Sequence, residues 1–354
     1  MSEHEYEVRI SDPGEVAAAL PHLLGFRPEE SVVVVGLGGP SGGRVGLTVR
    51  ADLPPPRHAV PLASALARGI ATDDPAAVVI AVVTEHDDEL DPDGGIDLPH
   101  RDVVHALVVT LADAGIPVRD ALLVRDGRWW SYDCPHECCL PGAGTPLPHG
   151  VSALEAASVA TGQVLAQSRE ELEARITHPD RDDREQVREA CFAMVNTRTA
   201  RAAEAGWSAV EKEAWVAVET AVAERRAEGA APPLGPRALA EIVWGLQHIP
   251  VRDRALGLAV GDDAAAAEAL WTECTRRAPW MLAAAPATLL AVSAWLRGDG
   301  AMAAVALDRA LGSDEDYQLA LLLRSALAAC MRPAELRAMV SATLDRLDAV
   351  RPAG

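Results

Sequence analysis

The chain has 354 residues, 49% of them hydrophobic and 24% charged, and its formal net charge is −20 at pH 7. This size and composition are typical of a folded protein of two domains and exclude an intrinsically disordered chain. The negative charge would repel phosphate backbones and anionic bilayers, so we predict neither a nucleic-acid nor a membrane partner.

The N-terminus and the cysteine content indicate the cellular compartment. Residues 1–5 are polar and acidic, so no secretory signal is expected. The longest apolar run, residues 282–296, contains Pro286 and is shorter than the ~20 residues that a membrane-spanning helix needs. Six cysteines in a chain without a leader predict mostly reduced thiols and a cytoplasmic location.

The first half of the chain alternates predicted helices and strands. A capping side chain at Ser11 or Asp12 starts the first helix, and Gly25 ends it. The β-branched run at 31–37 is typical of a strand buried on both faces, and Asp126-Gly127 suits a tight hairpin turn. The expected elements are a helix up to residue 24, strands at 31–37 and 44–50, a helix at about 58–70, a strand at 77–84, a helix at about 99–114, and strands at 121–125 and 128–132.

This order predicts two domains. Residues 1–150 are expected to form an α/β domain, a mixed sheet with flanking helices that ends in a cysteine-rich turn. Residues 151–350 show no strand pattern and are expected to form an all-helical domain with a break at 285–286. A hairpin at about 284–317 resembles a single tetratricopeptide unit, and a generic helical hairpin is the simpler interpretation.

Four segments, in the same order along the chain, resemble an actinobacterial family known as domain of unknown function 4192. They are residues 23–28 leading into the predicted strand, residues 50–54, the cysteines of 134–139 after residues 127–129, and residues 294–301. The resemblance spans nearly the whole chain. It implies no known activity, cofactor or catalytic residue.

The sharpest chemical feature is the segment Cys134-Pro135-His136-Glu137-Cys138-Cys139. Thiolates and imidazoles are ligands that Zn²⁺ prefers, so Cys134, Cys138, Cys139 and His136 are candidate metal ligands. His149 is an alternative to His136. The irregular spacing leaves two other hypotheses open, namely packed inert thiols and a reactive thiol.

Three other segments carry weaker chemical signals. Residues 36–43 are glycine-rich, but a strand follows them instead of a helix, which favours a hairpin connection over a phosphate loop. The acidic segment 85–97 partly matches a calcium loop, and a solvated loop is the simpler interpretation. Arg50 and Asp52, two positions apart at a strand end, predict an ion pair or an anion-binding arginine oriented by its neighbour.

Two functional hypotheses follow. In the first, this is a soluble binding or regulatory protein whose helical domain offers a surface to a protein partner. In the second, it is an enzyme with a site in the α/β domain where the cysteines, Arg50, Asp52 and the acidic segment meet. Zn²⁺ at the cysteines is the candidate cofactor and is compatible with both hypotheses.

Overall fold

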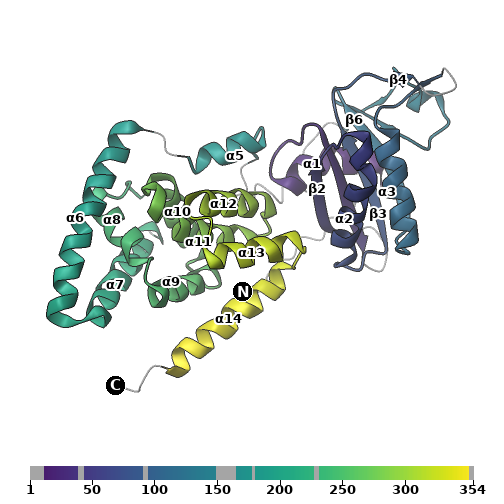
Figure 1. Cartoon of the computed structure of the whole chain (residues 1–354). Coiled ribbons are helices and arrows are strands. Elements are labelled where there is room, and N and C mark those ends of the chain that lie inside the picture. Colours follow the sequence, from purple (N-terminus) through teal and green to yellow (C-terminus); the bar gives the residue numbers. More distant parts are fainter. Residues whose placement is uncertain are drawn as a thin grey trace. The chain divides into compact units, whose positions relative to one another are not determined.

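The computed structural model describes residues 12–38, 44–90, 95–148, 165–177, 180–226 and 231–350. The chain forms two compact units, Met1–Arg169 and Glu170–Gly354 (Figure 1). The first unit extends beyond the expected boundary at residue 150, because Ala166 pairs with the backbone around Phe26. Arg27 N donates to Ala166 O at 3.1 Å, and Ala166 N donates to Gly25 O at 3.1 Å.

The first unit is an α/β unit, as the sequence predicts. Its helices and strands are α1 (Pro13–Leu24), β1 (Ser31–Gly38), β2 (Arg44–Asp52), η1 (Pro56–His58), α2 (Ala59–Ala71), β3 (Ala77–Val83), β4 (Glu89–Leu90), β5 (Ile96–Asp97), α3 (Arg101–Asp113), β6 (Val118–Arg125), β7 (Arg128–Ser131), η2 (Glu137–Cys139) and β8 (Thr145–Pro146).

Six strands form a mixed sheet in the order β2-β1-β3-β6-β7-β8. The β3–β6 pair is parallel, and the other pairs are antiparallel. Strands β2, β3 and β6 therefore run in the same direction and end at one edge of the sheet, where β1 begins. We call this edge the carboxyl edge. In mixed and parallel sheets it is the place where ligands usually bind.

Helices cover both faces of the sheet (Figure 1). Val33 and Val35 of β1 pack with α1 on one face, and Val32 and Val34 pack with α2 and α3 on the other. All four valines are fully buried. This two-sided burial explains why β1 is a continuous β-branched run instead of an alternating one.

Local sequence signals set the ends of these elements. The Asp12 side chain accepts from Gly14 N at 2.6 Å and caps α1. Gly25 ends the same helix with a positive φ of 78°, which a residue without Cβ adopts at low cost. Asp126 and Gly127 have φ of 50° and 67°, as a type I′ hairpin turn requires, and join β6 to β7.

In the described part of the second unit every regular element is a helix. The helices from residue 169 onward are α5 (Arg169–Arg175), α6 (Arg181–Ala205), α7 (Trp207–Arg226), α8 (Pro236–Gly245), α9 (Ile249–Leu256), η3 (Gly257–Ala259), α10 (Ala264–Arg277), η4 (Trp280–Leu282), α11 (Ala284–Leu296), α12 (Gly300–Ser313), α13 (Gln318–Ala328) and α14 (Pro333–Val350).

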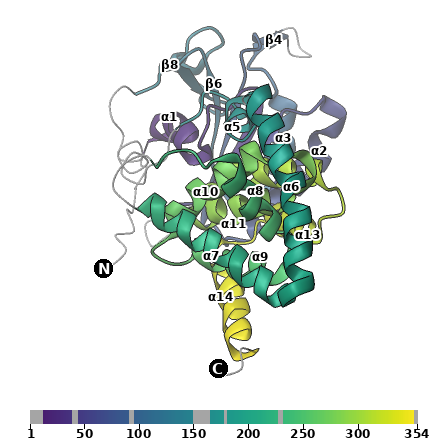
Figure 2. The same ribbon diagram turned by 90° about the vertical axis from the view of Figure 1, so that its left-hand side faces the viewer.

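Helix α11 is the centre of this unit, and Figure 2 shows other helices around it. All of its residues are buried, as expected for the longest apolar run of the chain. The expected break at 285–286 falls inside its first turn, where proline is tolerated because the turn leaves its N–H groups unpaired. Helices α11 and α12 form the predicted hairpin around Gly298, whose φ is 92°.

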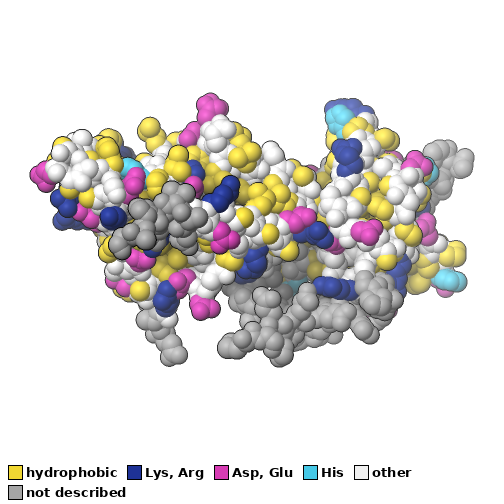
Figure 3. Space-filling view, turned by 90° about the horizontal axis from the view of Figure 1, so that it is seen from below, with side chains coloured by type: hydrophobic (Ala, Val, Ile, Leu, Met, Phe, Trp, Pro, Cys, Tyr) yellow, Lys and Arg dark blue, Asp and Glu magenta, His cyan; other side chains and the backbone are white. Residues whose placement is uncertain are grey.

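Positively and negatively charged side chains are interspersed on the surface. On the face seen in Figure 3, arginine side chains alternate with carboxylates and hydrophobic groups. Several arginines of the helical unit are paired, for example Arg201 with Glu213 at 2.9 Å and Arg297 with Glu268 at 2.8 Å. Within the described ranges, no helix is both long and apolar enough to cross a bilayer.

Candidate functional site

Three of the four predicted metal ligands come together in space. The Sγ atoms of Cys134, Cys138 and Cys139 all lie within 4.8 Å of one another, and we call these residues the thiol cluster. The Sγ atoms of Cys138 and Cys139 are 3.8 Å apart. Cys139 is buried, Cys138 is exposed, and all three are free thiols.

The backbone around the thiol cluster donates hydrogen bonds to sulfur. Ser131 N donates to Cys139 Sγ at 3.3 Å. Burial raises the pKa of Cys139 to about 11, and the Ser131 bond opposes this rise. A hydrogen bond from the backbone N–H of His136 is the main cause that lowers the pKa of Cys134.

His136 therefore contributes its backbone and not its ring. Its ring nitrogens do not belong to the group of ligand atoms that the three cysteines form, and its side chain is exposed. His149, the alternative ligand, lies outside the described residues.

Arg50 and Asp52 form an ion pair at the end of β2. Arg50 Nη2 is 2.6 Å from Asp52 Oδ1, and Arg50 Nε donates to Ser31 Oγ at 2.9 Å. The guanidinium also lies 5.8 Å from the ring centroid of Phe26. These contacts connect the start of β1 with the end of β2. Arg50 therefore stabilises the carboxyl edge.

A pocket of about 720 Å³ opens at the carboxyl edge, and we call it the edge pocket. One wall is apolar and consists of Leu53 and Pro54–Pro56, directly after β2. The polar wall comes from the β1 start, the loop after β3 and the start of α3. Its side chains are Glu30, His86, Glu89, Asp97, His100, Arg101, Asp102 and His105.

Glu30, His86 and His100 converge in the edge pocket, and we call them the histidine–glutamate trio. One ligand atom of each lies within 4.8 Å of the others. His86 Nε2 is 3.8 Å from Glu30 Oε2, and the two imidazole rings stack with centroids 5.4 Å apart. Nε2 of His100 is buried and has no hydrogen-bond partner among the described residues.

Neighbouring groups orient the trio. Thr84 Oγ1 donates to Glu30, with both carboxylate oxygens within 2.9 Å, and Glu85 N donates to Oε1 at 3.1 Å. Arg125 Nη1 donates to the backbone oxygen of His86 at 2.6 Å, which fixes the loop after β3. The same arginine pairs with Asp88 at 2.9 Å.

Two residues of the trio have unusual backbone conformations. Glu30 has a φ of 38° and His100 a φ of 60°. Residues other than glycine rarely adopt positive φ, and such strain concentrates at functional sites. The fold therefore holds these two side chains at the pocket at some cost in backbone energy.

Arg101 is occupied by contacts within the protein. It pairs with Asp97, with Nη2 2.6 Å from Oδ1, and Nη1 donates to Tyr132 O at 3.2 Å. The hydrogen bond from Arg101 lowers the pKa of Asp97. This wall of the pocket is thus a fixed ion pair, and the positive charge is neutralised.

The three segments of the enzyme hypothesis converge only in part. Arg50, Asp52 and the loop after β3 lie at the carboxyl edge, whereas no cysteine lines the edge pocket. Cys139 of the thiol cluster accepts a hydrogen bond from Ser131 N, and Ser131 pairs with Leu122 in the middle of β6. Asp91 and Asp93 of the calcium-loop hypothesis lie outside the described residues.

The helical unit exposes several large apolar side chains. Trp280 is 62% exposed, Met281 81% and Leu322 67%. The protein partner predicted for this unit stays a prediction.

The comparisons with known proteins point to a family and to nothing finer. No curated protein and no solved structure matches the chain. The model of one family, described as "Domain of unknown function (DUF4192)", matches residues 13–334 and so covers most of both units. The chain therefore belongs to the DUF4192 family, as the resemblance of its segments predicts.

Proposed function

We propose that the protein is a metal-dependent enzyme whose site is the edge pocket of the α/β unit. Glu30, His86 and His100 are the ligands of one divalent transition-metal ion, and Zn²⁺ is the ion that we propose. The observation that carries this proposal is the convergence of three ligand atoms, from three separate segments, within 4.8 Å of one another at a pocket.

The ligand set and its spacing suit zinc. Two imidazoles and one carboxylate occur in catalytic zinc centres. Zinc–ligand bonds of about 2.0–2.2 Å in a tetrahedron place ligand atoms roughly 3.3–3.6 Å apart. His86 Nε2 and Glu30 Oε2 are already 3.8 Å apart, so small side-chain rotations would complete the site. A metal ion would also give the buried Nε2 of His100 a partner.

The charges of the pocket favour a cation. Glu30, Glu89 and Asp102 line it, and Asp97 neutralises Arg101, the arginine of its wall. The whole chain carries a formal charge of −20, which raises the local concentration of cations.

The ligand set gives the site its proposed chemistry. A zinc ion held by these three side chains would have room for a water molecule and would supply Lewis-acid activation of that water. A pocket of about 720 Å³ is of the size that holds a small molecule. We infer hydrolysis of a small substrate whose apolar part rests on Pro54–Pro56; Glu89 and Asp102, which also line the pocket, are the candidate general bases.

Zinc binding to the full chain tests this proposal. The protein, reduced and stripped of metal, is titrated with ZnCl₂ in a calorimeter. His86→Ala is expected to bind one zinc fewer than the wild type. His105→Ala removes a histidine of the same wall that is outside the trio, so it should keep wild-type stoichiometry. Circular dichroism checks that each variant folds.

The enzymatic part is tested with p-nitrophenyl acetate and bis(p-nitrophenyl) phosphate. We expect zinc-dependent hydrolysis of at least one probe, lost in His86→Ala. Equal zinc stoichiometry in wild type and His86→Ala would refute the metal site. Zinc binding at the trio without hydrolysis of either probe would restrict the function to metal-dependent binding.

Thr84→Val should weaken zinc binding at the trio by about 10- to 100-fold, the range found when an outer-shell partner of a ligand is removed. The substitution preserves shape but removes the hydroxyl that donates to Glu30. Thr110→Val is the control, because its hydroxyl donates to Ala106 O within α3. Competition with a zinc-binding dye measures both affinities, and equal values in the two variants would contradict this role of Thr84.

A further inference from the structure

We propose that the thiol cluster is a second metal centre, in which Cys134, Cys138 and Cys139 bind one Zn²⁺ ion through three thiolates. The fourth coordination position faces solvent, and the ion holds the segment between β7 and β8 in its shape. This goes beyond the proposed function, since it uses other ligands outside the edge pocket.

The spacing of the sulfur atoms is compatible with a tetrahedral zinc site. With Zn–S bonds of about 2.3 Å, two sulfurs of a tetrahedron lie roughly 3.8 Å apart. Cys138 Sγ and Cys139 Sγ are separated by 3.8 Å, and Cys134 Sγ lies within 4.8 Å of both. A disulfide would require about 2.0 Å between two of them, so these positions suit a shared ion better than a covalent bond.

A backbone N–H group donates a hydrogen bond to one sulfur of the cluster. Ser131 N donates to the buried Cys139 Sγ at 3.3 Å. Hydrogen bonds from outside the coordination sphere orient metal ligands and tune them. The position of Cys138, which is exposed, leaves one side of the cluster open to solvent. A fourth ligand of the ion would come from this open side.

The segment that carries the cluster is held to the sheet mainly by hydrogen bonds: Arg128 Nη1 donates to Ala143 O and Gly144 O, and β7 pairs with β8. From residue 133 to residue 148, Cys139 is the one buried residue. Regular structure in this stretch is limited to η2 and the short strand β8. Metal ligation can add folding energy to such an irregular segment. Inert, packed thiols would be buried, but Cys138 is exposed and Cys134 only half-buried.

Cobalt binding to the reduced, full-length protein tests this inference. Thiolate ligands give Co²⁺ an intense near-ultraviolet charge-transfer absorption, which imidazole and carboxylate ligands do not. We expect this absorption in the wild type, its loss in Cys138→Ser, and its retention in Cys330→Ser, whose cysteine is outside the cluster. His86→Ala should also retain it, so failure of this inference and failure of the edge-pocket proposal are distinguishable.

A second measurement needs no variant. Zinc is expected to protect Cys138 of the wild type from iodoacetamide, as read by peptide mass spectrometry, because its exposed sulfur is then a ligand. Absence of the charge-transfer absorption in the fully reduced wild type, or equal alkylation of Cys138 with and without zinc, would overturn the inference.

Discussion

Replacing Glu30 by glutamine is expected to weaken zinc binding in the edge pocket by more than about 100-fold. That is the upper end of the loss caused by removing an outer-shell partner, and this substitution alters a ligand itself. Glu30 supplies the only negative charge of the trio, and glutamine turns one of its two acceptor atoms into a donor. Calorimetry with competing chelator at fixed pH measures the change.

The fold should tolerate Glu30→Gln. The amide oxygen still accepts from Thr84 or from Glu85 N, so the thermal unfolding midpoint is expected to change little. Glu29→Gln is the matched control, because the neighbouring carboxylate does not line the pocket. Wild-type zinc affinity in a folded Glu30→Gln protein would exclude Glu30 as a ligand.

Features that neighbouring residues determine could be predicted from the sequence. The valines of β1 indicate two covered faces, and Gly25 and Asp126-Gly127 end or turn the chain where expected. The cysteines of the thiol cluster lie within six positions of one another, so their proximity is also a local property. The direction of the His136 ring depends on the turn geometry, which spacing alone does not give.

The histidine–glutamate trio could not be predicted in the same way. Glu30 precedes His86 by 56 positions and His100 by 70, so no spacing motif joins them. Glu30 and His86 meet because β1 lies antiparallel beside β3, which brings the start of one strand to the end of the other, and His100 stands at the start of α3. Ser31 pairs with Val83 in this register. The register is a property of the tertiary structure and not of the local sequence. The one available signal was the general rule that ligands gather where strands end.

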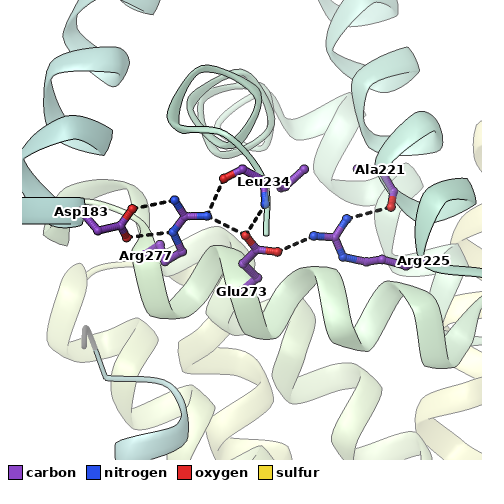
Figure 4. A network of polar contacts seen from close by, with 6 residues as sticks. All are labelled: Asp183, Ala221, Arg225, Leu234, Glu273 and Arg277. Carbon is purple, nitrogen blue, oxygen red and sulfur yellow. Dashed lines mark hydrogen bonds and ion pairs between the residues drawn. The ribbon is translucent and has the colours of Figure 1, made fainter. Parts of the chain in front are cut away.

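The helical unit contains a charge network that the sequence reveals only in part. Glu273 and Arg277 are one helical turn apart on α10, a spacing that predicts a pair. The structure adds Arg225 from the end of α7 and Asp183 from the start of α6 (Figure 4). Four charges from three helices thus meet around the chain at Leu234.

Glu273 is the centre of this network. Its Oε1 accepts from Leu234 N at 2.7 Å and from Arg277 Nη1 at 2.6 Å, and its Oε2 accepts from Arg225. Arg277 in turn forms a two-point pair with Asp183 at 2.7 and 2.8 Å and donates to Leu234 O. Arg225 is 6% exposed and Arg277 11%, so water cannot replace a missing carboxylate well.

Glu273→Ala is therefore expected to lower the free energy of unfolding by about 3–5 kcal/mol, the usual cost of removing one partner from a buried ion pair. Arg225 and Arg277 stay buried in this variant, and each loses a carboxylate that accepts its hydrogen bond. Leu234 N also loses its hydrogen-bond acceptor. Urea unfolding followed by far-ultraviolet circular dichroism measures the loss. Glu185→Ala is the control: it breaks the solvent-exposed pair with Arg188 and should leave stability unchanged. Equal stability of the two variants would mean that the network at α6, α7 and α10 contributes no more than a surface pair.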